Sequence, residues 1–383
     1  METFKPGLEG VVAATTSLSE VDGARGELTI AGFPIGDLAP HATFEEAVWL
    51  LWHGTPPTAP EVAAFRADLS ASRDLPAAAT ALLRQAAAVN LDSMDALRMA
   101  AGAISLASAD APRLVGTMPT IVAAYWRLKR GDQPLAPRPD LGHAANFLYM
   151  LTGETPDPER VRALETYLNT VIDHGLNAST FAVRVIISTG SDLVSAIVGG
   201  LGALKGPLHG GAPGPALDMV FEIGTADRAE DILRAKLARG ERLMGFGHRV
   251  YKVRDPRADV LATAAERLYT RAGDMKLYRL AREVESVAIR LLEEQKPGRH
   301  LQTNVEFYTA LLLHGLGFDV SLFTPTFAVS RVAGWIGHAM EQQRANRLIR
   351  PQSVYVGPRG RSWVSRAEHA TEGEHKPSIA SRV

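Results

Sequence analysis

Apolar residues recur at spacings of three and four along most of this chain, the pattern of helices that bury one face. Prolines and glycines separate the apolar runs and mark where helices end. At Thr43, for example, a capping box with Glu46 opens an apolar run that ends at Gly54. The pattern predicts helices over residues 43–54, 58–72, 77–89, 93–107, 119–130, 161–188, 216–223, 227–239, 257–272, 276–295, 305–316 and 326–347.

Only one segment has the character of β-structure. Residues 26–38, GELTIAGFPIGDL, are short, β-branched and punctuated by glycine, which predicts a small hairpin. Strands do not alternate with helices elsewhere, which argues against a Rossmann or barrel scaffold. We therefore predict an all-α protein.

Length and composition narrow the class further. A chain of 383 residues exceeds the size at which one core keeps growing, so we expect two domains or one elaborated domain. A hydrophobic fraction of 46%, a charged fraction of 22% and a net charge of -1 describe a soluble protein without a nucleic-acid-binding surface. No signal peptide opens the chain, and charges interrupt its apolar stretches. We expect a cytoplasmic protein that does not bind membranes.

The absence of several residues and motifs excludes common chemistries. The chain has no cysteine, which excludes disulfides, thiolate metal sites and a cysteine nucleophile. It also lacks the GxxxxGK[ST], HExxH and GxSxG motifs and a dinucleotide fingerprint. The eleven histidines show no metal-ligand spacing beside a carboxylate, so we expect no metal site. Acid-base chemistry remains the best candidate.

The motif GFGHRVYKVRDPR, residues 245–257, concentrates candidate chemistry. Gly245 and Gly247 allow the backbone to approach a ligand closely, and His248 follows them. The cations that come next suit an anion, because the arginine fork matches carboxylates and phosphates. The alternative is a basic loop before a helix that Asp255 caps and Pro256 begins.

Other candidates stand in separate segments, each with a structural alternative. His209 lies between a proline and a glycine pair in GPLHGG, where backbone carbonyls could also satisfy it. Glu306 has capping-box spacing from Thr303, so its structural role would be to bond its own N-cap amide. His174 falls in a helical pattern that Gly175 interrupts, and a core polar group is its alternative.

Two arginines complete the candidates. Arg331 lies in an almost wholly apolar helix, where a guanidinium needs an anionic partner. Arg350 precedes Pro351 and could be a surface residue. Beyond it, residues 357–383 are polar and aperiodic, which predicts a loose tail or an arm on a partner.

In this order and at these separations, GPLHGG, GFGHRVYKVRDPR, NVEFY, the helix around Arg331 and RLIRPQS resemble the citrate synthase family. The resemblance covers nearly the whole chain. It implies an all-α, two-domain fold, with a large dimer-forming domain at 1–210 and 315–383 and a smaller mobile helical domain at 211–314 that closes over the active site. The implied reaction condenses oxaloacetate with acetyl-CoA and hydrolyses the thioester to citrate and CoA, with no permanently bound cofactor.

The resemblance also implies residue roles. His209 would donate a hydrogen bond to the thioester carbonyl, His248 would polarise and protonate the oxaloacetate ketone, and Glu306 would remove the methyl proton. Positions that match binders of the substrate carboxylates are His174, Arg257, Arg331 and Arg350, the last supplied across a homodimer interface. Positions that match the CoA site are Gly245, Phe246, Gly247, Lys252 and Asn304.

Two departures concern the acyl pocket. The family usually has aspartate where Glu306 stands, and it commonly continues GPLHGG with ANE where this chain has Ala212, Pro213 and Gly214. A 2-methylcitrate synthase that uses propionyl-CoA is therefore an alternative, because one methylene is worth only about 1–3 kcal/mol of discrimination. A catalytically silent sensor of CoA esters or carboxylates is a third possibility, against which His209, His248 and Glu306 argue.

Overall fold

The computed structural model describes residues 4–106, 110–210, 213–361 and 363 of the chain. Residues up to Leu348 form one compact unit, and Ile349–Val383 form a second. The structure is mostly helical, which confirms the predicted all-α class. The helices are α1 Ile35–Leu38, α2 Phe44–His53, α3 Ala59–Ala71, α4 Ala77–Ala88, α5 Ser93–Gly102, α6 Ala111–Lys129, α7 His143–Thr152, α8 Pro158–Val171, α9 Ala178–Ser188, α10 Leu193–Leu204, α11 Pro213–Ile223, α12 Ala229–Ala238, α13 Pro256–Ala272, α14 Lys276–Gln295, α15 Val305–Gly315 and α16 Phe323–Arg344.

The predicted hairpin is present, and a further strand joins it. Strands β2 (Glu27–Ile30) and β3 (Phe33–Pro34) pair antiparallel, and β1 (Ser19–Asp22) pairs with the other edge of β2. Glycines at the β1–β2 turn lie against the segment that follows His248: a Cβ on Gly23 would stand 2.3 Å from the Val250 carbonyl oxygen. The sheet therefore braces the motif that the sequence singled out.

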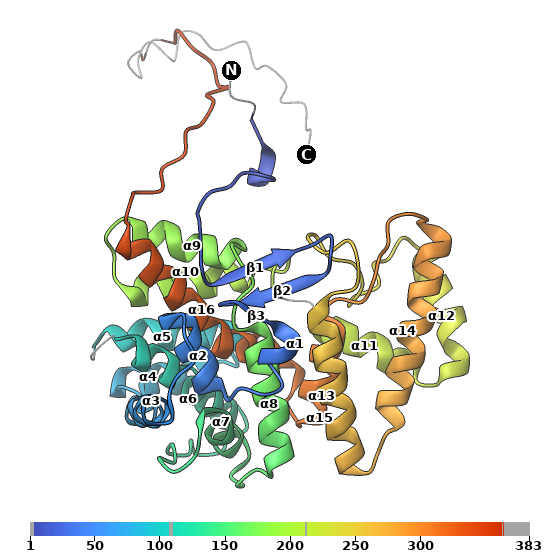
Figure 1. Ribbon diagram of the computed structural model, residues 1–383, viewed down its shortest axis with the longest axis horizontal. Coiled ribbons are helices and arrows are strands. Elements are labelled where there is room, and N and C mark those ends of the chain that lie inside the picture. Colours follow the sequence, from blue (N-terminus) through green and yellow to red (C-terminus); the bar gives the residue numbers. More distant parts are fainter. Residues whose placement is uncertain (1–3, 107–109, 211–212, 362, 364–383) are drawn as a thin grey trace. The chain divides into compact units, whose positions relative to one another are not determined.

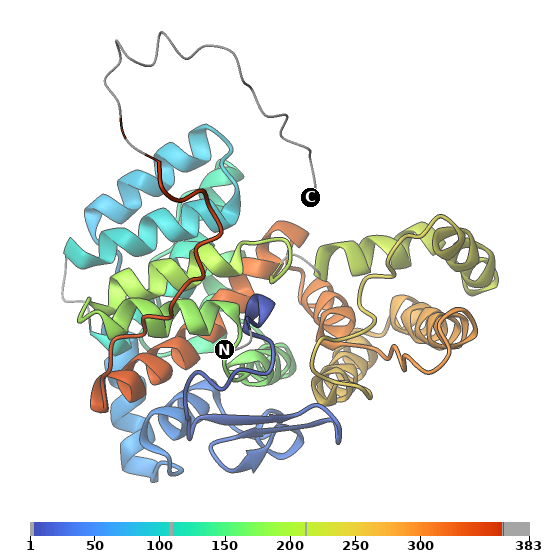
Figure 2. The ribbon, with the colours of Figure 1, turned by 90° about the horizontal axis from the view of Figure 1, so that it is seen from above.

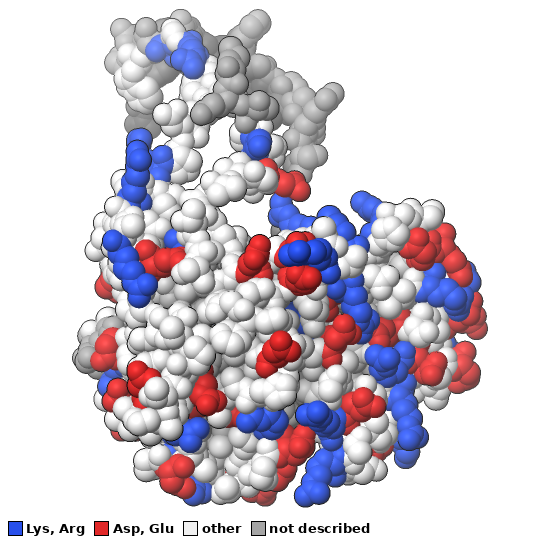
Figure 3. Space-filling view, in the orientation of Figure 1, with Lys and Arg blue, Asp and Glu red and all other residues white. Residues whose placement is uncertain are grey.

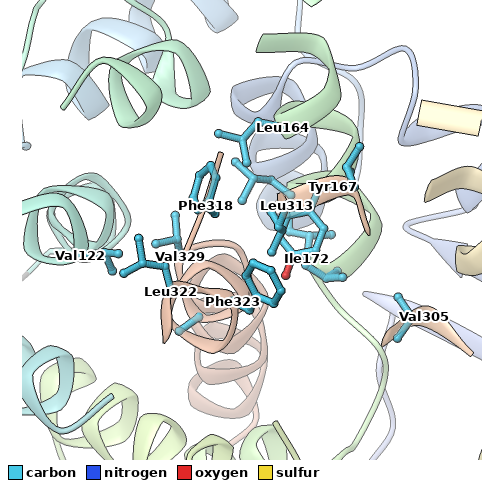
Figure 4. Packing of buried hydrophobic residues seen from close by; sticks show 14 of the residues in the cluster. Val122, Leu164, Tyr167, Ile172, Val305, Leu313, Phe318, Leu322, Phe323 and Val329 are labelled. Atoms are coloured by element: carbon cyan, nitrogen blue, oxygen red, sulfur yellow. The ribbon is translucent and has the colours of Figure 1, made fainter. Parts of the chain in front are cut away.

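Helix α16 is the centre of the core. It packs against α2, α5, α6, α8, α9 and α10. Figure 4 shows Phe323 and Val329 of α16 among buried side chains of neighbouring helices, including Val122 and Tyr167. Burial of each such side chain contributes about 1.5–3 kcal/mol, so the position of α16 is firmly fixed.

Helices α11, α12 and α14 lie together to one side of the other helices in both Figure 1 and Figure 2. Acidic and basic side chains are mixed on this side in Figure 3. Helices α12 and α14 are joined by a network in which Arg234 and Arg290 each pair with both Glu230 and Glu294. Exposed pairs of this kind contribute little individually.

Two helix predictions differ most from the structure in their bounds. The helix expected to begin at Pro119 begins at Ala111, because Asp110 caps it by accepting a hydrogen bond from the Arg113 amide, and Pro119 lies inside α6. The single helix expected over 161–188 is two helices, α8 and α9. Gly175 interrupts it with a φ of +60°, a left-handed conformation suited to glycine, and Asn177 caps α9.

Other predictions lie partly outside the described residues. The expected domain boundary between 210 and 211 borders the gap at 211–212, and most of the predicted tail lies beyond residue 363. Among the described residues, no helix is both long and apolar enough to span a bilayer. The cytoplasmic location stays a prediction.

Candidate active site

Side chains singled out by the motifs meet at one cavity of about 860 Å³. The segments that bring them there are far apart in the sequence: the α8–α9 connection, the residues after α10, the loop before α13, the first turn of α15 and the middle of α16. The predicted residues at this cavity are His174, His209, His248, Arg257, Glu306 and Arg331. We call it the reaction cavity.

Glu306 does not cap its own helix, so the capping-box interpretation was wrong. The N-cap of α15 is Asn304, whose Oδ1 accepts a hydrogen bond of 3.0 Å from the Glu306 amide. Thr303 lies before the helix, and its hydroxyl donates to Glu285 instead, over 2.6 Å. This shift of one residue releases the Glu306 side chain from a structural role and leaves it in the cavity wall.

The surroundings of Glu306 favour its protonated form. Burial raises the pKa of its carboxyl group to about 7, while the nearby Arg257 and Arg331 act in the opposite direction. A carboxylate with a pKa near 7 is half ionised at neutral pH and is a stronger base than an ordinary glutamate. Glu306 therefore has the properties of a general base.

His248 is held by the backbone that follows it. Its Nδ1 accepts hydrogen bonds of 3.0 Å from the amides of both Val250 and Tyr251, and these two shorter bonds, against the 3.4 Å from Arg257 Nη2 to Nε2, place the proton of the neutral ring on Nε2. Burial and the charge of Arg257 lower the pKa of His248 to about 4. The ring is consequently neutral at physiological pH and has a donor on Nε2.

His209 is held through a serine. Its Nε2 lies 2.8 Å from the hydroxyl of Ser179, which also receives the Trp335 indole N–H at 3.2 Å and lies 2.8 Å from Oδ1 of Asn177. The single hydroxyl proton of Ser179 has two acceptors, the amide oxygen and the imidazole. Burial, followed by the charge of Arg331, lowers the pKa of His209 to about 4, so this ring is neutral as well.

The two arginines of the cavity differ in their partners. Asp255 neutralises Arg257 through contacts of 3.0 Å at Nε and 2.8 Å at Nη2, and both side chains are buried. Arg331 donates from Nε to the carbonyl oxygen of Val171 over 2.7 Å, but its buried Nη2 has no partner among the described residues. Burial lowers the pKa of Arg331 to about 10, so the group remains charged.

An unsatisfied buried guanidinium is costly, and the anionic partner that the sequence predicts for Arg331 is absent from the described part of the chain. The carboxylate nearest in the sequence to its Val171 contact, Asp173, bonds other groups instead. Because Arg331 lines the reaction cavity, a bound anion there would receive its free N–H groups.

His174 completes the reaction cavity. Its Nε2 lies 3.1 Å from the Tyr251 hydroxyl, and its ring meets that of His248 edge to face, with 5.6 Å between centroids. Burial, and then the charge of Arg257, lowers the pKa of His174 well below its usual value. His174 is therefore a neutral hydrogen-bonding group beside two cations.

A second cavity of about 590 Å³ adjoins the first and shares residues of its wall, among them His209, His248 and Asn304. Its lining includes every position predicted for the CoA site: Gly245, Phe246, Gly247, Lys252 and Asn304. It also contains cations that the motifs did not single out: Arg242, Lys296 and Arg299. We call it the basic cavity, since this lining suits a phosphorylated ligand.

The glycines of the basic cavity are required by the backbone. Gly245 and Gly247 have φ values of +89° and +82°, and a Cβ on Gly245 would lie 2.9 Å from Phe307. The carbonyl of Gly245 accepts from the Asn304 amide over 2.9 Å, and that of Gly247 accepts from the Asn304 side chain over 2.8 Å. These bonds fasten the glycine loop to the start of α15, and so connect His248 with Glu306.

The remaining candidates fall outside the two cavities or were missed. Arg350 lies exposed in the second unit, Ile349–Val383. Arg254, one of the cations in the motif of residues 245–257, pairs with Asp259 and Glu285. Sequence reasoning missed Ser179, because a lone serine inside a helix carries no signal of its contact with His209.

No group of three or more histidine, aspartate or glutamate side chains could hold a metal ion in the part of the chain that the structure describes. The cavities contain three neutral histidines, a carboxylate with a raised pKa and an arginine whose Nη2 has no partner among the described residues, with basic side chains beside them. Groups of this kind suit acid-base chemistry on an anionic substrate that binds beside a phosphorylated ligand.

Comparison with known proteins makes the assignment specific. Residues 7–352 match the family described as citrate synthase, C-terminal domain. The chain is 42% identical over 380 residues to citrate synthase 2 of Bacillus subtilis, across 96% of this chain and 100% of that protein. It is 41% identical to the 2-methylcitrate synthase of Mycobacterium tuberculosis, across 92% and 91% of the two chains.

A solved structure gives the same result. The fold matches the Thermoplasma acidophilum citrate synthase in ternary complex with carboxymethyl coenzyme A and oxaloacetate, with a TM-score of 0.87 and 32% sequence identity. The match covers 96% of this chain and all of that one. The chain belongs to the citrate synthase family.

Proposed function

We propose that the enzyme condenses oxaloacetate with acetyl-CoA and hydrolyses the resulting citryl thioester to citrate and CoA. The observation that carries the proposal is the convergence of Glu306, His209 and His248 on one cavity, beside arginines suited to a dicarboxylate. The similar Thermoplasma enzyme, whose complex contains oxaloacetate and a CoA derivative, supports the same pair of substrates.

Oxaloacetate would bind in the reaction cavity. The free N–H groups of Arg331 would receive one carboxylate, and Arg257 and His174 line the same space. Each carboxylate taken from water needs a charged, directional partner, which a guanidinium provides. Arg350, supplied by a partner subunit, would add a further cation.

The first chemical step would be removal of a methyl proton from acetyl-CoA by Glu306. The developing enolate oxygen would accept a hydrogen bond from His209, which must then present a proton on Nδ1. That tautomer requires the Ser179 hydroxyl to donate to Nε2 rather than to Asn177. The 2.8 Å contact between Ser179 and His209 would thus determine which nitrogen of His209 carries the proton.

The second step would form the carbon–carbon bond. The enolate carbon attacks the ketone carbon of oxaloacetate, and the ketone oxygen takes a proton from Nε2 of His248, the nitrogen that the two backbone amides leave protonated. Water then hydrolyses the thioester and releases CoA. Proximity and exclusion of water would supply much of the acceleration, since a carboxylate alone is a weak base for such a proton.

CoA would occupy the basic cavity, with Gly245–Gly247 against the adenine and Lys252 and Asn304 in contact with the cosubstrate. The cations Arg242, Lys296 and Arg299, which line the same cavity, favour its phosphates. No permanently bound cofactor or metal takes part in the proposed steps.

Closure of residues 211–314 over the site as a small domain, against a large domain of 1–210 and 315–383, is also part of the proposal. Its support is the placement of α11, α12 and α14 to one side of the other helices in Figures 1 and 2. The glycine loop and Glu306 fall within the small-domain range, whereas His174, His209 and Arg331 fall within the large-domain range. Closure would therefore assemble the site.

We further propose a homodimer in which Arg350 completes the partner's site. The support is the exposure of apolar side chains in the Ile349–Val383 unit, including Val354 at 77% and Val356 at 93%. Mixing inactive R350A subunits with inactive E306Q subunits would then restore part of the activity, because one site of a mixed dimer has both residues intact. No recovery after subunit exchange would exclude the shared site.

The deciding experiment measures CoA thiol release with oxaloacetate and acetyl-CoA. The chain contains no cysteine, so the protein contributes no thiol background. We expect turnover that requires both substrates. If neither acetyl-CoA nor propionyl-CoA is turned over, the proposed function is excluded.

A 2-methylcitrate synthase is the second candidate, favoured by the 41% identity to the Mycobacterium enzyme of that name. The two reactions would use the same residues, and one methylene changes discrimination by only about 1–3 kcal/mol. The ratio of kcat/KM for acetyl-CoA to that for propionyl-CoA decides between them.

A further inference from the structure

A line of buried polar side chains connects the far end of α16 with the segment that carries His174. Arg184 of α9 is its centre: Nη2 pairs with Glu341, Nη1 donates to Gln342 over 3.2 Å, and Nε donates to Nδ1 of His338 over 3.1 Å. Arg184 and His338 are buried. None of these residues lines the reaction cavity or the basic cavity.

The arginine fixes the proton on His338. A guanidinium only donates, so Nδ1 of His338 must accept, and the proton of the neutral ring is on Nε2. Nε2 faces the carboxylate of Asp173, at 3.2 Å and 3.3 Å from its two oxygens. His338 therefore donates to Asp173, the residue immediately before His174.

Asp173 in turn anchors the backbone on the other side of His174. Its Oδ2 accepts a 2.5 Å hydrogen bond from the hydroxyl of Ser19 on β1, and that hydroxyl accepts from the Gly175 amide over 2.9 Å. Gly175 is the residue in the left-handed conformation that separates α8 from α9. His174 thus lies between Asp173 and Gly175, and the Asp173 carboxylate holds the Gly175 amide through the Ser19 hydroxyl.

Helix α16 contacts this segment directly. A Cβ on Gly334 would stand 2.3 Å from the carbonyl oxygen of Ile172 and 2.9 Å from Oδ1 of Asp173, so only glycine permits this approach. Arg331, one turn earlier on α16, bonds the carbonyl oxygen of Val171. The same helix therefore carries Arg331 and fixes residues 171–175 at two points.

We propose that His338 and Asp173 are positioning residues, which hold His174 and Arg331 at the separation that binds oxaloacetate. They do so by fastening the α8–α9 connection to α16, and they contact no substrate. The inference rests on the proposed function, because it assigns oxaloacetate to the reaction cavity. A displacement of about 1 Å at such a site can cost on the order of a hundredfold in rate, so a buried anchor of this kind has a measurable effect.

The test compares two substitutions at His338. In H338Q the amide can still accept from Arg184 and donate to Asp173, whereas H338M has a similar size and neither function. For H338M we expect the KM for oxaloacetate, and its dissociation constant by calorimetry, to rise about tenfold, which corresponds to about 1.4 kcal/mol. The KM for the CoA ester should change little. H338Q should stay within about threefold of the parent enzyme.

Hydrogen exchange provides a readout that does not depend on turnover. Peptides covering residues 171–177 should exchange faster in H338M than in H338Q, because the Gly175 amide loses its anchored acceptor. If H338M lowers the melting temperature but leaves oxaloacetate affinity and this exchange unchanged, the network is only a stabilising one and the proposal is wrong. Equal impairment of H338Q and H338M would also overturn it.

A second variant covers failure of H338M to fold. S19A removes only the hydroxyl between Asp173 and Gly175, and it should raise the oxaloacetate dissociation constant about threefold; no change there would contradict the proposal. If the parent enzyme binds oxaloacetate but turns over no CoA ester, the proposed function is wrong. The role of His338 can still be tested, because the variants are compared by their oxaloacetate binding. A parent enzyme that does not bind oxaloacetate would overturn both.

Discussion

Two glutamates in neighbouring parts of the molecule have opposite surroundings. Glu285, on α14, is buried and its oxygens are fully used. It pairs with Arg254 over 2.7 Å and Arg282 over 3.1 Å, and it accepts from the hydroxyls of Thr303 at 2.6 Å and Tyr308 at 2.5 Å. These contacts join α14 to the start of α15.

Glu306, in the first turn of α15, shares that region but not those partners. No hydrogen bond or ion pair connects its carboxylate with another residue in the described ranges, although Arg257 and Arg331 act on it through their charges. Burial is the dominant effect on its pKa, which lies near 7. The protein keeps this carboxylate poorly solvated and unbonded.

The difference separates a structural carboxylate from a functional one. A buried charge that serves the fold is surrounded by donors, because an unsatisfied one is costly. An ionised group that must accept a proton or bind an anion during the reaction needs hydrogen-bonding positions that the protein itself does not occupy. Arg331, with its free Nη2, belongs with Glu306 on this criterion, and Arg254 belongs with Glu285.

The largest expected effect is on turnover in E306Q. Loss of the base should lower kcat about a thousandfold, within the range typical of general base catalysis. The melting temperature should not fall, since the substitution removes a poorly solvated charge. Steady-state kinetics and calorimetric binding of oxaloacetate measure the two properties. Unchanged kcat would show that Glu306 is not the base.

E285Q should have the opposite profile. Glu285 is buried whereas Arg254 and Arg282 are partly exposed, so loss of its charge should cost about 1–3 kcal/mol of unfolding free energy. Urea denaturation measures the loss. The matched control is E283Q, an exposed glutamate on the same helix, which should change stability little. Loss of kcat in E285Q without loss of stability would break the distinction drawn above.

R331M should impair binding without impairing folding. The KM for oxaloacetate should rise about thirtyfold, equivalent to about 2 kcal/mol, because the free N–H groups of Arg331 are proposed to bind a carboxylate. Unfolding free energy should change less than in R254M, since methionine removes a buried charge whose Nη2 has no partner, and this gain offsets the loss of the Nε bond to Val171. R254M is the control: it should lose stability and keep the KM. The reverse pattern would place the anion elsewhere.

The sequence predicted the elements of the fold well, because helix starts and stops are local. Thr43 with Glu46, and Asp255 with Pro256, predicted the starts of α2 and α13 at the places where the structure has them. The predicted start of α15 at residue 305 was also right, but its N-cap was wrong by one position, since Thr303 and Asn304 are both good caps. In the structure the Thr303 hydroxyl donates to Glu285, so Asn304 is left to cap the helix. A contact between residues 18 positions apart is not visible in a local sequence pattern.

The candidate site was predicted through motifs rather than through geometry. Placement of His174, His209 and Arg331 at one cavity follows from packing of α8, α10 and α16, which residue spacing does not determine. The carboxylate Asp173 and its partner His338 gave no signal at all. The contact between them depends on the close approach of α16 to residues 172–173 at Gly334. A glycine inside an apolar helix can serve several structural purposes, so its presence in the sequence does not predict this approach.

The smallest of the expected effects concerns pH, and it tests the Glu306 environment without a substitution. A pKa of about 7 means that the base is mostly ionised at pH 8 and mostly protonated at pH 6, so kcat/KM for oxaloacetate should fall about tenfold between these values. His209 and His248, with pKa values of about 4, remain neutral across this range and do not contribute to the fall.

The same pKa has a consequence for stability, with a definite sign. Because the pKa of folded Glu306 is raised above that of the unfolded chain, its contribution to stability is complete below about pH 4.5 and is lost as the pH rises through about 7. E306Q should lack this loss, so its stability relative to the parent enzyme should increase from pH 5 to pH 8. Parallel pH profiles of unfolding for the two proteins would mean that the Glu306 carboxylate is well solvated, and that only its lack of partners separates it from Glu285.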